Sequence, residues 1–268
     1  MDADPVTIGA GLLGARGLTQ VIGRVVGPAA DEVAAALARY TEYRLRNVGR
    51  VTENAARKTQ QDTGTVPMRV AMRVFEEGSY SDDDVVVEYL GGVLASSRTE
   101  LGRDDRGNTY TALVARLSTY HLRSHFIWYS EFRRLLRGRN INVYDGSQLH
   151  QQALMFMPYV VYDAAMDYGP GEHAGRLFSH SVYALQRESL IELVRAGNVD
   201  HLRKAHAGVT DPGMVIRPTV AGCELFLWAH GLGQLEAKDF TSEDLDLQPF
   251  EGVTIEPAAQ LVNDMNGR

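Results

Sequence analysis

Residues 28–61, PAADEVAAALARYTEYRLRNVGRVTENAARKTQQ, carry the clearest structural pattern in the chain. Pro28 suits the start of a helix, and Asp31 and Glu32 suit the positive end of its dipole. Apolar residues then recur at spacings of three and four, or at multiples of them: Val33, Leu37, Tyr40, Val48, Val51 and Ala55. These six residues are called the seam below. The pattern predicts a long basic helix, reaching about Gln61, that makes a coiled-coil or bundle contact.

The preceding segment, residues 5–30, reads PVTIGAGLLGARGLTQVIGRVVGPAA and holds six glycines and no acidic side chain. At helical spacing Arg16, Gln20 and Arg24 share one side, and the opposite side is apolar: Ile8, Leu12, Ala15, Leu18, Ile22 and Val25. Each glycine costs a helix about 0.8–1 kcal/mol relative to alanine, so this segment needs a partner surface. Gly23 and Gly27 also form a G-x-x-x-G, which lets helices approach closely in lipid. We expect a core or subunit-contact helix, or an interfacial membrane helix.

Three other interpretations of this segment are excluded by its residues and by those around it. Residues 9–14 match G-x-G-x-x-G, but no buried strand of useful length precedes them and no βαβ alternation follows. The uncharged run of residues 5–15 is shorter than the ~20 apolar residues of a membrane span. Asp2 and Asp4 stand where a secretory signal carries positive charge. The sequence therefore predicts no cofactor, no simple span and no secretory signal.

The composition of the chain limits which classes of function remain. The chain has 268 residues, 44% hydrophobic and 23% charged, as is typical of a soluble globular protein. Its single cysteine, Cys223, excludes an intrachain disulfide and a thiolate metal cluster and favours the cytoplasm. The net charge of −7 argues against nucleic acid as a partner. Residues 16–58 nevertheless hold eight basic and four acidic side chains, an excess that suits anionic lipid or an acidic partner.

The rest of the chain divides into two further units. Residues 63–169 follow a linker and read as a helical core domain, in which Ser81 is expected to cap a helix that begins with three aspartates. Residues 170–268 contain a helical pattern, a short apolar run and a second helix, an order that suggests a small winged-helix-like element. The second helix, within residues 219–235, holds no Lys or Arg, unlike a DNA-recognition helix.

The fold prediction is therefore mainly α. It is a multi-helix bundle with a long N-terminal helix in residues 1–62 and a small winged-helix-like α+β element near the C-terminus.

One pair of side chains has the spacing of a metal site. His121 and His125 are four residues apart on a predicted helix, a spacing that can hold zinc. A metalloprotease would need H-E-x-x-H, but residue 122 is leucine and supplies no general base. The surrounding residues are aromatic, so packed or hydrogen-bonded histidines are the preferred interpretation. No nucleophile motif is present, and Cys223 lies in an apolar run.

A set of short motifs carries a resemblance to a known family. In order they are Pro28-Ala29-Ala30-Asp31-Glu32, Val66-Pro67, Ser81-Asp82-Asp83-Asp84, Leu90-Gly91-Gly92-Val93-Leu94-Ala95, Arg116-Leu117-Ser118 and Arg217-Pro218-Thr219-x-x-Gly222. Over about residues 28–235 the chain resembles the abortive-infection alpha-like family of bacterial proteins. The segment 138–146 and the tail after Leu235 have no counterpart in it. The resemblance implies antiviral (phage) defence, with growth arrest or death of the infected cell as the output, and it implies no catalytic residue.

The sequence thus predicts a non-enzymatic antiphage protein whose N-terminal helices assemble, or perturb the inner membrane, after a phage or host trigger. We expect a cytoplasmic homo-oligomer that can lie at an anionic membrane surface. The expected contact residues are Ile8, Leu12, Arg16, Leu18, Ile22, Gly23, Arg24, Gly27, Val33, Leu37, Tyr40, Val48 and Val51. The alternative is a soluble structural or interaction module that forms a homo-oligomer. A second alternative is a metal-dependent hydrolase that uses His121 and His125.

Overall fold

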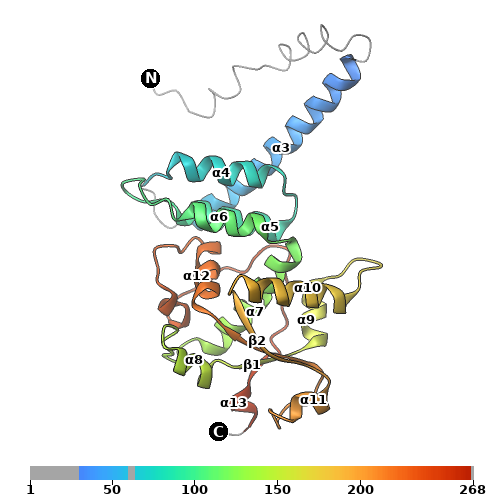
Figure 1. Ribbon diagram of the computed structural model, residues 1–268. Helices are drawn as coiled ribbons and strands as arrows, with labels where there is room; N and C mark the ends of the chain where they lie inside the picture. The colour runs from blue at the N-terminus through green and yellow to red at the C-terminus, as the bar shows by residue number, and fades with distance from the viewer. Residues whose placement is uncertain (1–29, 60–63, 267–268) are drawn as a thin grey trace.

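The structure, a computed structural model, describes residues 30–59 and 64–266, with side chains from residue 36 onward. Over these residues the fold is mainly helical and includes a small antiparallel sheet of four strands (Figure 1). Among the described helices, none combines the length and the apolar character that crossing a membrane requires.

The helices, in chain order, are α3 (Ala30–Lys58), α4 (Met68–Ser79), α5 (Asp84–Ser96), α6 (Gly107–Arg116), α7 (Thr119–Leu136), α8 (Gly146–Gln152), α9 (Tyr159–Met166), α10 (Ala174–Arg187), α11 (Val199–Arg203), α12 (Val220–Ala229), the 3₁₀ helix η2 (Ala237–Thr241) and α13 (Val262–Met265). The strands are β1 (Met155–Pro158), β2 (Ile191–Gly197), β3 (Gly213–Pro218) and β4 (Gln260–Leu261).

Side-chain caps fix where three of the central helices begin. Asp83 accepts hydrogen bonds from the N–H groups of Val85 and Val86 and so starts α5. The sequence-based choice of Ser81 as this cap is wrong, because the helix begins three residues later. Ser118 caps α7 and Thr219 caps α12, and each accepts from a backbone N–H three residues on. These bonds satisfy donors that a helix start otherwise leaves unpaired.

Helix α5 lies at the centre of the helical part of the molecule and is buried along almost its whole length. It packs between α3 and α12, and two adjacent glycines allow the close approach. A Cβ atom on Gly92 would lie 1.9 Å from the carbonyl oxygen of Ala229, and one on Gly91 would lie 2.3 Å from Oδ1 of Asn54. Only glycine fits at these two positions with the present helix spacing.

The sheet has the strand order β2-β3-β1-β4, and all its neighbours are antiparallel. Met155 and Ile216 pair across β1 and β3 and belong to the main core. Phe156 and Val215 pair one residue along and belong to a smaller cluster on the opposite face, with Leu202 of α11. The two central strands, β1 and β3, are therefore buried on both faces, consistent with their short, apolar sequences.

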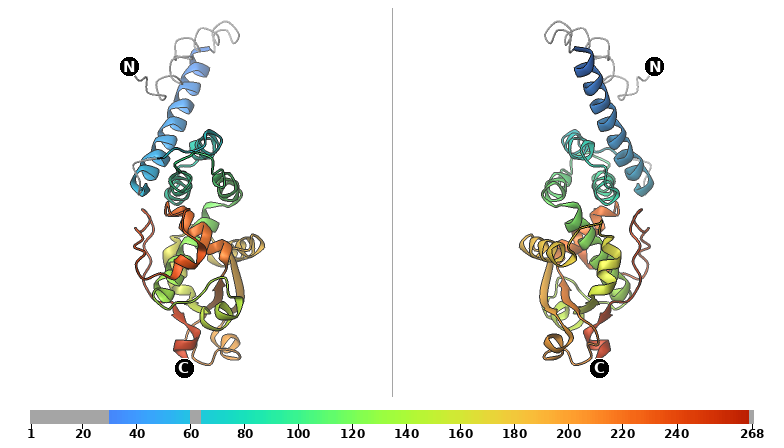
Figure 2. Two further views of the ribbon diagram at one scale, coloured as in Figure 1. Left: turned by 90° about the vertical axis from the view of Figure 1, so that its left-hand side faces the viewer. Right: turned by 90° about the vertical axis from the view of Figure 1, so that its right-hand side faces the viewer.

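After η2 the chain runs without regular structure through residues 242–259, called the C-terminal strap below. Figure 2 shows it passing along one side of the body before it reaches β4. Arginines at α7 hold the strap by donating to its backbone carbonyls. These contacts are Arg123 to Gly252, Arg133 to Ser242 and Leu245, Arg134 to Ala259, and Arg137 to Glu243.

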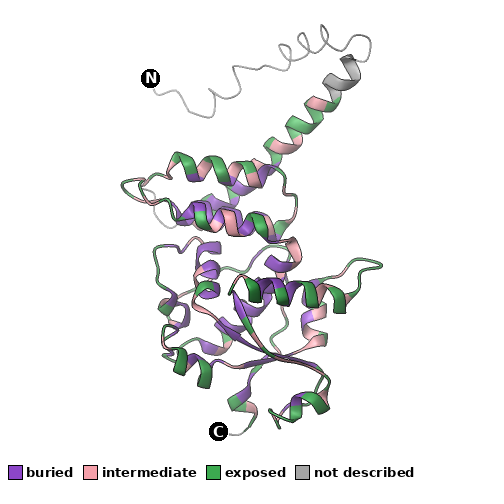
Figure 3. Cartoon of the chain, viewed as in Figure 1, coloured by how far each residue is buried: buried purple, intermediate pink, exposed green. Residues whose placement is uncertain are grey.

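The two halves of α3 have different surroundings. Its C-terminal half packs against α4 and α5, whereas its N-terminal half projects away from the body (Figures 1 and 2). Figure 3 shows the projecting turns as exposed or intermediate, without a buried position before Asn47 among the described side chains. The projecting half therefore gains little tertiary packing from the described part of its own chain, limited to contacts of Tyr40, Tyr43 and Arg44 with the end of α4. Packing normally supplies most of a helix's stability.

The glycine contacts lead to a test of this packing. We expect Gly92→Ala to lower the free energy of unfolding by about 1–3 kcal/mol, because the methyl group would overlap the Ala229 backbone. Gly49 of α3 is the matched control, since a Cβ atom there meets nothing within 4 Å. Gly49→Ala should raise the stability by about 0.8–1 kcal/mol through helix propensity. Urea unfolding of both variants measures the difference, and equal effects would contradict this packing.

Candidate functional site

The seam divides between the body and the projecting half of α3. Val51 is fully buried and Ala55 is 6% exposed, and both pack in the core of their own chain. Val48 and Leu37 are half-buried, and Tyr40 is 45% exposed. The side chain of Val33 lies outside the described part of the chain, as do Ile8, Leu12, Arg16, Leu18, Ile22, Gly23, Arg24 and Gly27. Val51 therefore packs within its own chain. The less buried positions of the seam, Val48, Tyr40 and Leu37, lie nearer the N-terminal end of α3.

Helix α4 ends where α3 leaves the body. The Arg44 guanidinium donates to Oγ of Ser79 from Nε at 2.9 Å and from Nη2 at 2.7 Å. It also lies over the Tyr80 ring, with Cζ 4.3 Å from the ring centroid. Asn47 is buried and donates to the Ser79 carbonyl oxygen. These contacts fix the direction in which the projecting half extends.

The described side chains of the projecting half are mostly exposed, and basic ones outnumber acidic ones. Between residues 36 and 46 the helix has three arginines and one acidic residue, Glu42, and the sequence places Asp31 and Glu32 before this stretch. Arg50 pairs with Asp84, and Arg44 is bound to Ser79. Arg39 and Arg46 take part in none of the ion pairs of the described residues. Their charges therefore face solvent and are not neutralised within the described chain.

At its C-terminal end α3 is held by a buried ion pair. Lys58 Nζ lies 2.5 Å from Oε2 of Glu88, and it donates to the carbonyl oxygens of Glu88 and Ala229 at 2.8 and 2.9 Å. Its ammonium also lies 4.3 Å from the ring centroid of Phe250 in the strap. Burial lowers the pKa of Lys58 to about 8, although the Glu88 charge acts in the opposite direction. Arg57 adds an ion pair to Glu251, with Nη1 2.7 Å from Oε1.

The ring nitrogens of His125 are both used inside the core. Nε2 lies 3.2 Å from the carbonyl oxygen of Gly222, which can only accept, so Nε2 carries the proton. Nδ1 then accepts from the Tyr89 hydroxyl, 2.5 Å away. Burial lowers the pKa of His125 to about 3. Neither nitrogen offers a lone pair to a metal in this arrangement.

His121 is bound in a different way. Its Nδ1 accepts from the N–H of Ser118 at 3.0 Å and completes the cap of α7. The proton of the neutral ring is therefore on Nε2, which has no hydrogen-bond partner among the described residues. Its ring lies 4.2 Å from that of His180, centroid to centroid. The structure thus gives the two histidines separate partners, and no group of three or more metal-binding side chains occurs in the described part of the chain.

The single cysteine lies away from solvent. Cys223 is 0% exposed, and burial together with the Glu224 charge raises the pKa of its thiol. Because the thiolate is the reactive form, this residue is unsuited to nucleophilic chemistry in the folded chain.

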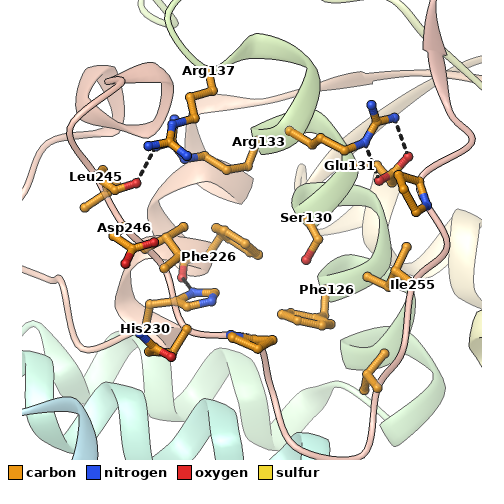
Figure 4. Close-up of a pocket in the computed structure, with 16 residues that line it drawn as sticks. Phe126, Ser130, Glu131, Arg133, Arg137, Phe226, His230, Leu245, Asp246 and Ile255 are labelled. Carbon is orange, nitrogen blue, oxygen red and sulfur yellow. Dashed lines mark hydrogen bonds and ion pairs between the residues drawn. The ribbon is translucent and has the colours of Figure 1, made fainter.

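A pocket of about 620 Å³ lies between α7, α12 and the strap (Figure 4). Phe126 and Phe226 form its apolar wall with His230, and Ser130, Arg133 and Arg137 form its polar side. Sequence reasoning missed this pocket, because the strap residues that close it lie more than 100 positions after α7. The one available signal was the group Arg133, Arg134 and Arg137 at the end of an otherwise aromatic helix.

The buried histidines predict acid destabilisation. Burial lowers the pKa of His125 and His230 to about 3 and that of His121 to about 4, against about 6.5 for an unperturbed histidine. As the pH falls, the unfolded chain binds these protons first, so this stability is complete above pH 6.5 and is lost below it, down to about pH 3. Urea unfolding between pH 6.5 and 4.5 measures the slope. His125→Phe should lower it by about one proton, or ~1.4 kcal/mol per pH unit, and an unchanged slope would refute the assignment.

Comparison of the chain with family models, with curated proteins and with solved structures finds no match.

Proposed function

We propose that this protein is a non-enzymatic antiphage protein of the abortive-infection type, which acts through its projecting N-terminal helix. The observation that supports this most directly is the projecting half of α3, whose seam continues beyond the packed half and meets the described chain where Tyr40 contacts Tyr80. An exposed helix with an apolar seam gains stability when that seam is covered by another helix. The resemblance over residues 28–235 supports the defence role.

The contact that we favour is self-association. The seam positions Leu37 and Tyr40 continue the row that Val51 and Ala55 form inside the body. A second copy carries the same row and can cover it, as in a symmetric dimer. An anionic membrane surface is the further partner in this proposal, because Arg39 and Arg46 form no ion pair with a carboxylate among the described residues.

We also propose that the mainly helical fold includes a winged-helix-like element near the C-terminus. The order α10, β2, α11, β3 and α12 supports it, since an antiparallel pair of strands, with the short α11 between them, lies between two longer helices in sequence. No nucleic-acid role is attached to it, because α12 carries Glu224 and neither Lys nor Arg.

The assembly contact can be tested on exposed seam residues. We expect light scattering to give an oligomer mass for the full chain and a monomer mass for the double variant Leu37→Glu with Tyr40→Glu, because two carboxylates would face the partner seam. The matched control is Ala38→Glu with Leu45→Glu, which adds the same charge at exposed positions outside the seam. Loss of the oligomer in both variants alike, or in neither, would overturn the seam as the contact.

The membrane and defence roles can be tested by truncation. Deletion of residues 1–27 should abolish toxicity in cells, protection in a phage challenge and leakage of anionic liposomes. The body should stay folded, because the packed half of α3 begins 20 residues further on. The circular dichroism spectrum and the urea midpoint serve as controls for folding. A truncated protein that remains fully active would rule out a role for this segment.

A further inference from the structure

The pocket between α7, α12 and the strap contains a buried positive charge without a counter-ion. Arg133 is 7% exposed, and its guanidinium donates to the carbonyl oxygens of Phe240, Ser242 and Leu245 at 3.0, 2.5 and 2.6 Å. These acceptors are neutral dipoles. Among the described residues, no carboxylate lies within ion-pair distance of Arg133. A buried charge in this state is costly unless an anion compensates it.

A second arginine increases the positive charge at the same wall. Arg137 lines the pocket and donates from Nε and Nη2 to the carbonyl oxygen of Glu243, again a neutral acceptor. Burial and the charge of Arg137 both lower the pKa of Arg133, so the two cations act on each other. Figure 4 shows both guanidinium groups on the side of the pocket near Leu245.

The acidic residues at the pocket do not neutralise this pair. Glu131 binds Arg134 through both carboxylate oxygens, each at 2.8 Å, and one of these oxygens also accepts from the N–H of Ala259. Asp246 lines the pocket but forms none of the ion pairs among the described residues. The carboxylates are thus either engaged elsewhere or too far away, and the pocket keeps a local excess of positive charge.

The opposite wall is aromatic. The ring centroids of Phe226 and His230 are 4.3 Å apart, and Phe126 lies 6.1 Å from Phe226 and 6.2 Å from His230. His230 is neutral, because burial lowers its pKa to about 3 and its Nδ1 donates to the Phe226 carbonyl oxygen. Ser130 also lines the pocket, and its hydroxyl points towards Phe126 (Figure 4). Phe126 and Phe226 are 3% and 2% exposed, and Phe126 also stacks on Phe250, so only a small part of each ring faces the pocket. A flat ligand ring can contact this part, and base–aromatic packing stabilises nucleotide complexes.

We propose that this pocket binds a small aromatic phosphomonoester of the size of a nucleoside monophosphate. The phosphate lies at Arg137 and Arg133, with the Ser130 hydroxyl as a further donor, and the ring packs against Phe126 and Phe226. A volume of about 620 Å³ is in the range of small-molecule sites. Arginine is the side chain best suited to a phosphate at a partly buried position. This site does not depend on the function proposed for α3.

Isothermal titration of the full chain tests the proposal with adenosine 5′-monophosphate as the probe. Adenosine and inorganic phosphate are the two parts of this probe and are titrated separately. Each should bind at least about tenfold more weakly than the monophosphate, because each fills only one side of the pocket. Absence of saturable binding of the monophosphate at millimolar concentration would overturn the proposal. Equal binding by inorganic phosphate would also overturn it, because the aromatic wall would then contribute nothing.

Two variants test whether the monophosphate binds in this pocket. Arg137→Gln should weaken monophosphate binding by about tenfold, the effect of losing a charged hydrogen bond. Ser130→Phe should abolish binding by filling the space. The matched control is Arg139→Gln, which removes the same charge two residues away, where the side chain pairs with Asp264 and does not line the pocket. Urea midpoints confirm that each variant is folded. Binding that survives in Ser130→Phe, or that falls equally in Arg139→Gln, would refute this location.

Discussion

The buried ion pair between Lys58 and Glu88 joins more parts of this molecule than any other contact described above. It links α3 to α5 directly, to α12 through the Ala229 carbonyl, and to the strap through the Phe250 ring. Removing one partner of such a pair leaves a buried charge and costs about 3–5 kcal/mol. Because the pair fixes the last turn of a 29-residue helix, the rest of that helix can pack only as far as the body extends. The projection of its other half is a consequence of this fixed end.

The strap depends on the same region and also closes the pocket. Phe250 contacts Lys58 on one side and stacks on Phe126 on the other, with ring centroids 4.1 Å apart. The arginines of α7 then hold the strap by its backbone carbonyls, which are present whatever the side chains are. The pocket wall and the end of α3 therefore share one short piece of chain. A shift of this segment would therefore alter both the pocket wall and the contacts at the end of α3.

Sequence patterns predicted the helical elements better than their partners. The spacing of the seam residues predicted a helix with an apolar row. Spacing alone does not show which part of such a row packs against its own chain. Val51 is buried in that way, whereas Tyr40 is 45% exposed. The histidine spacing was compatible with a metal, and only the geometry showed that His125 bonds Tyr89 and Gly222 instead. The pocket could not be predicted, because its arginines bind carbonyl oxygens from distant, irregular chain. The arginines at the end of α7 are visible in the sequence, but the carbonyl groups that they bind are not, because every residue carries one.

The burial of Cys223 has a practical consequence for work on this protein. It is the only cysteine of the chain and is fully enclosed in the core, so the folded protein presents no reactive thiol of its own. A cysteine introduced at an exposed position of α3, such as Leu45→Cys, would be the single site for a spin label or a fluorophore. Distances between two such labels would report the arrangement of neighbouring copies, and reactivity at Cys223 would report unfolding.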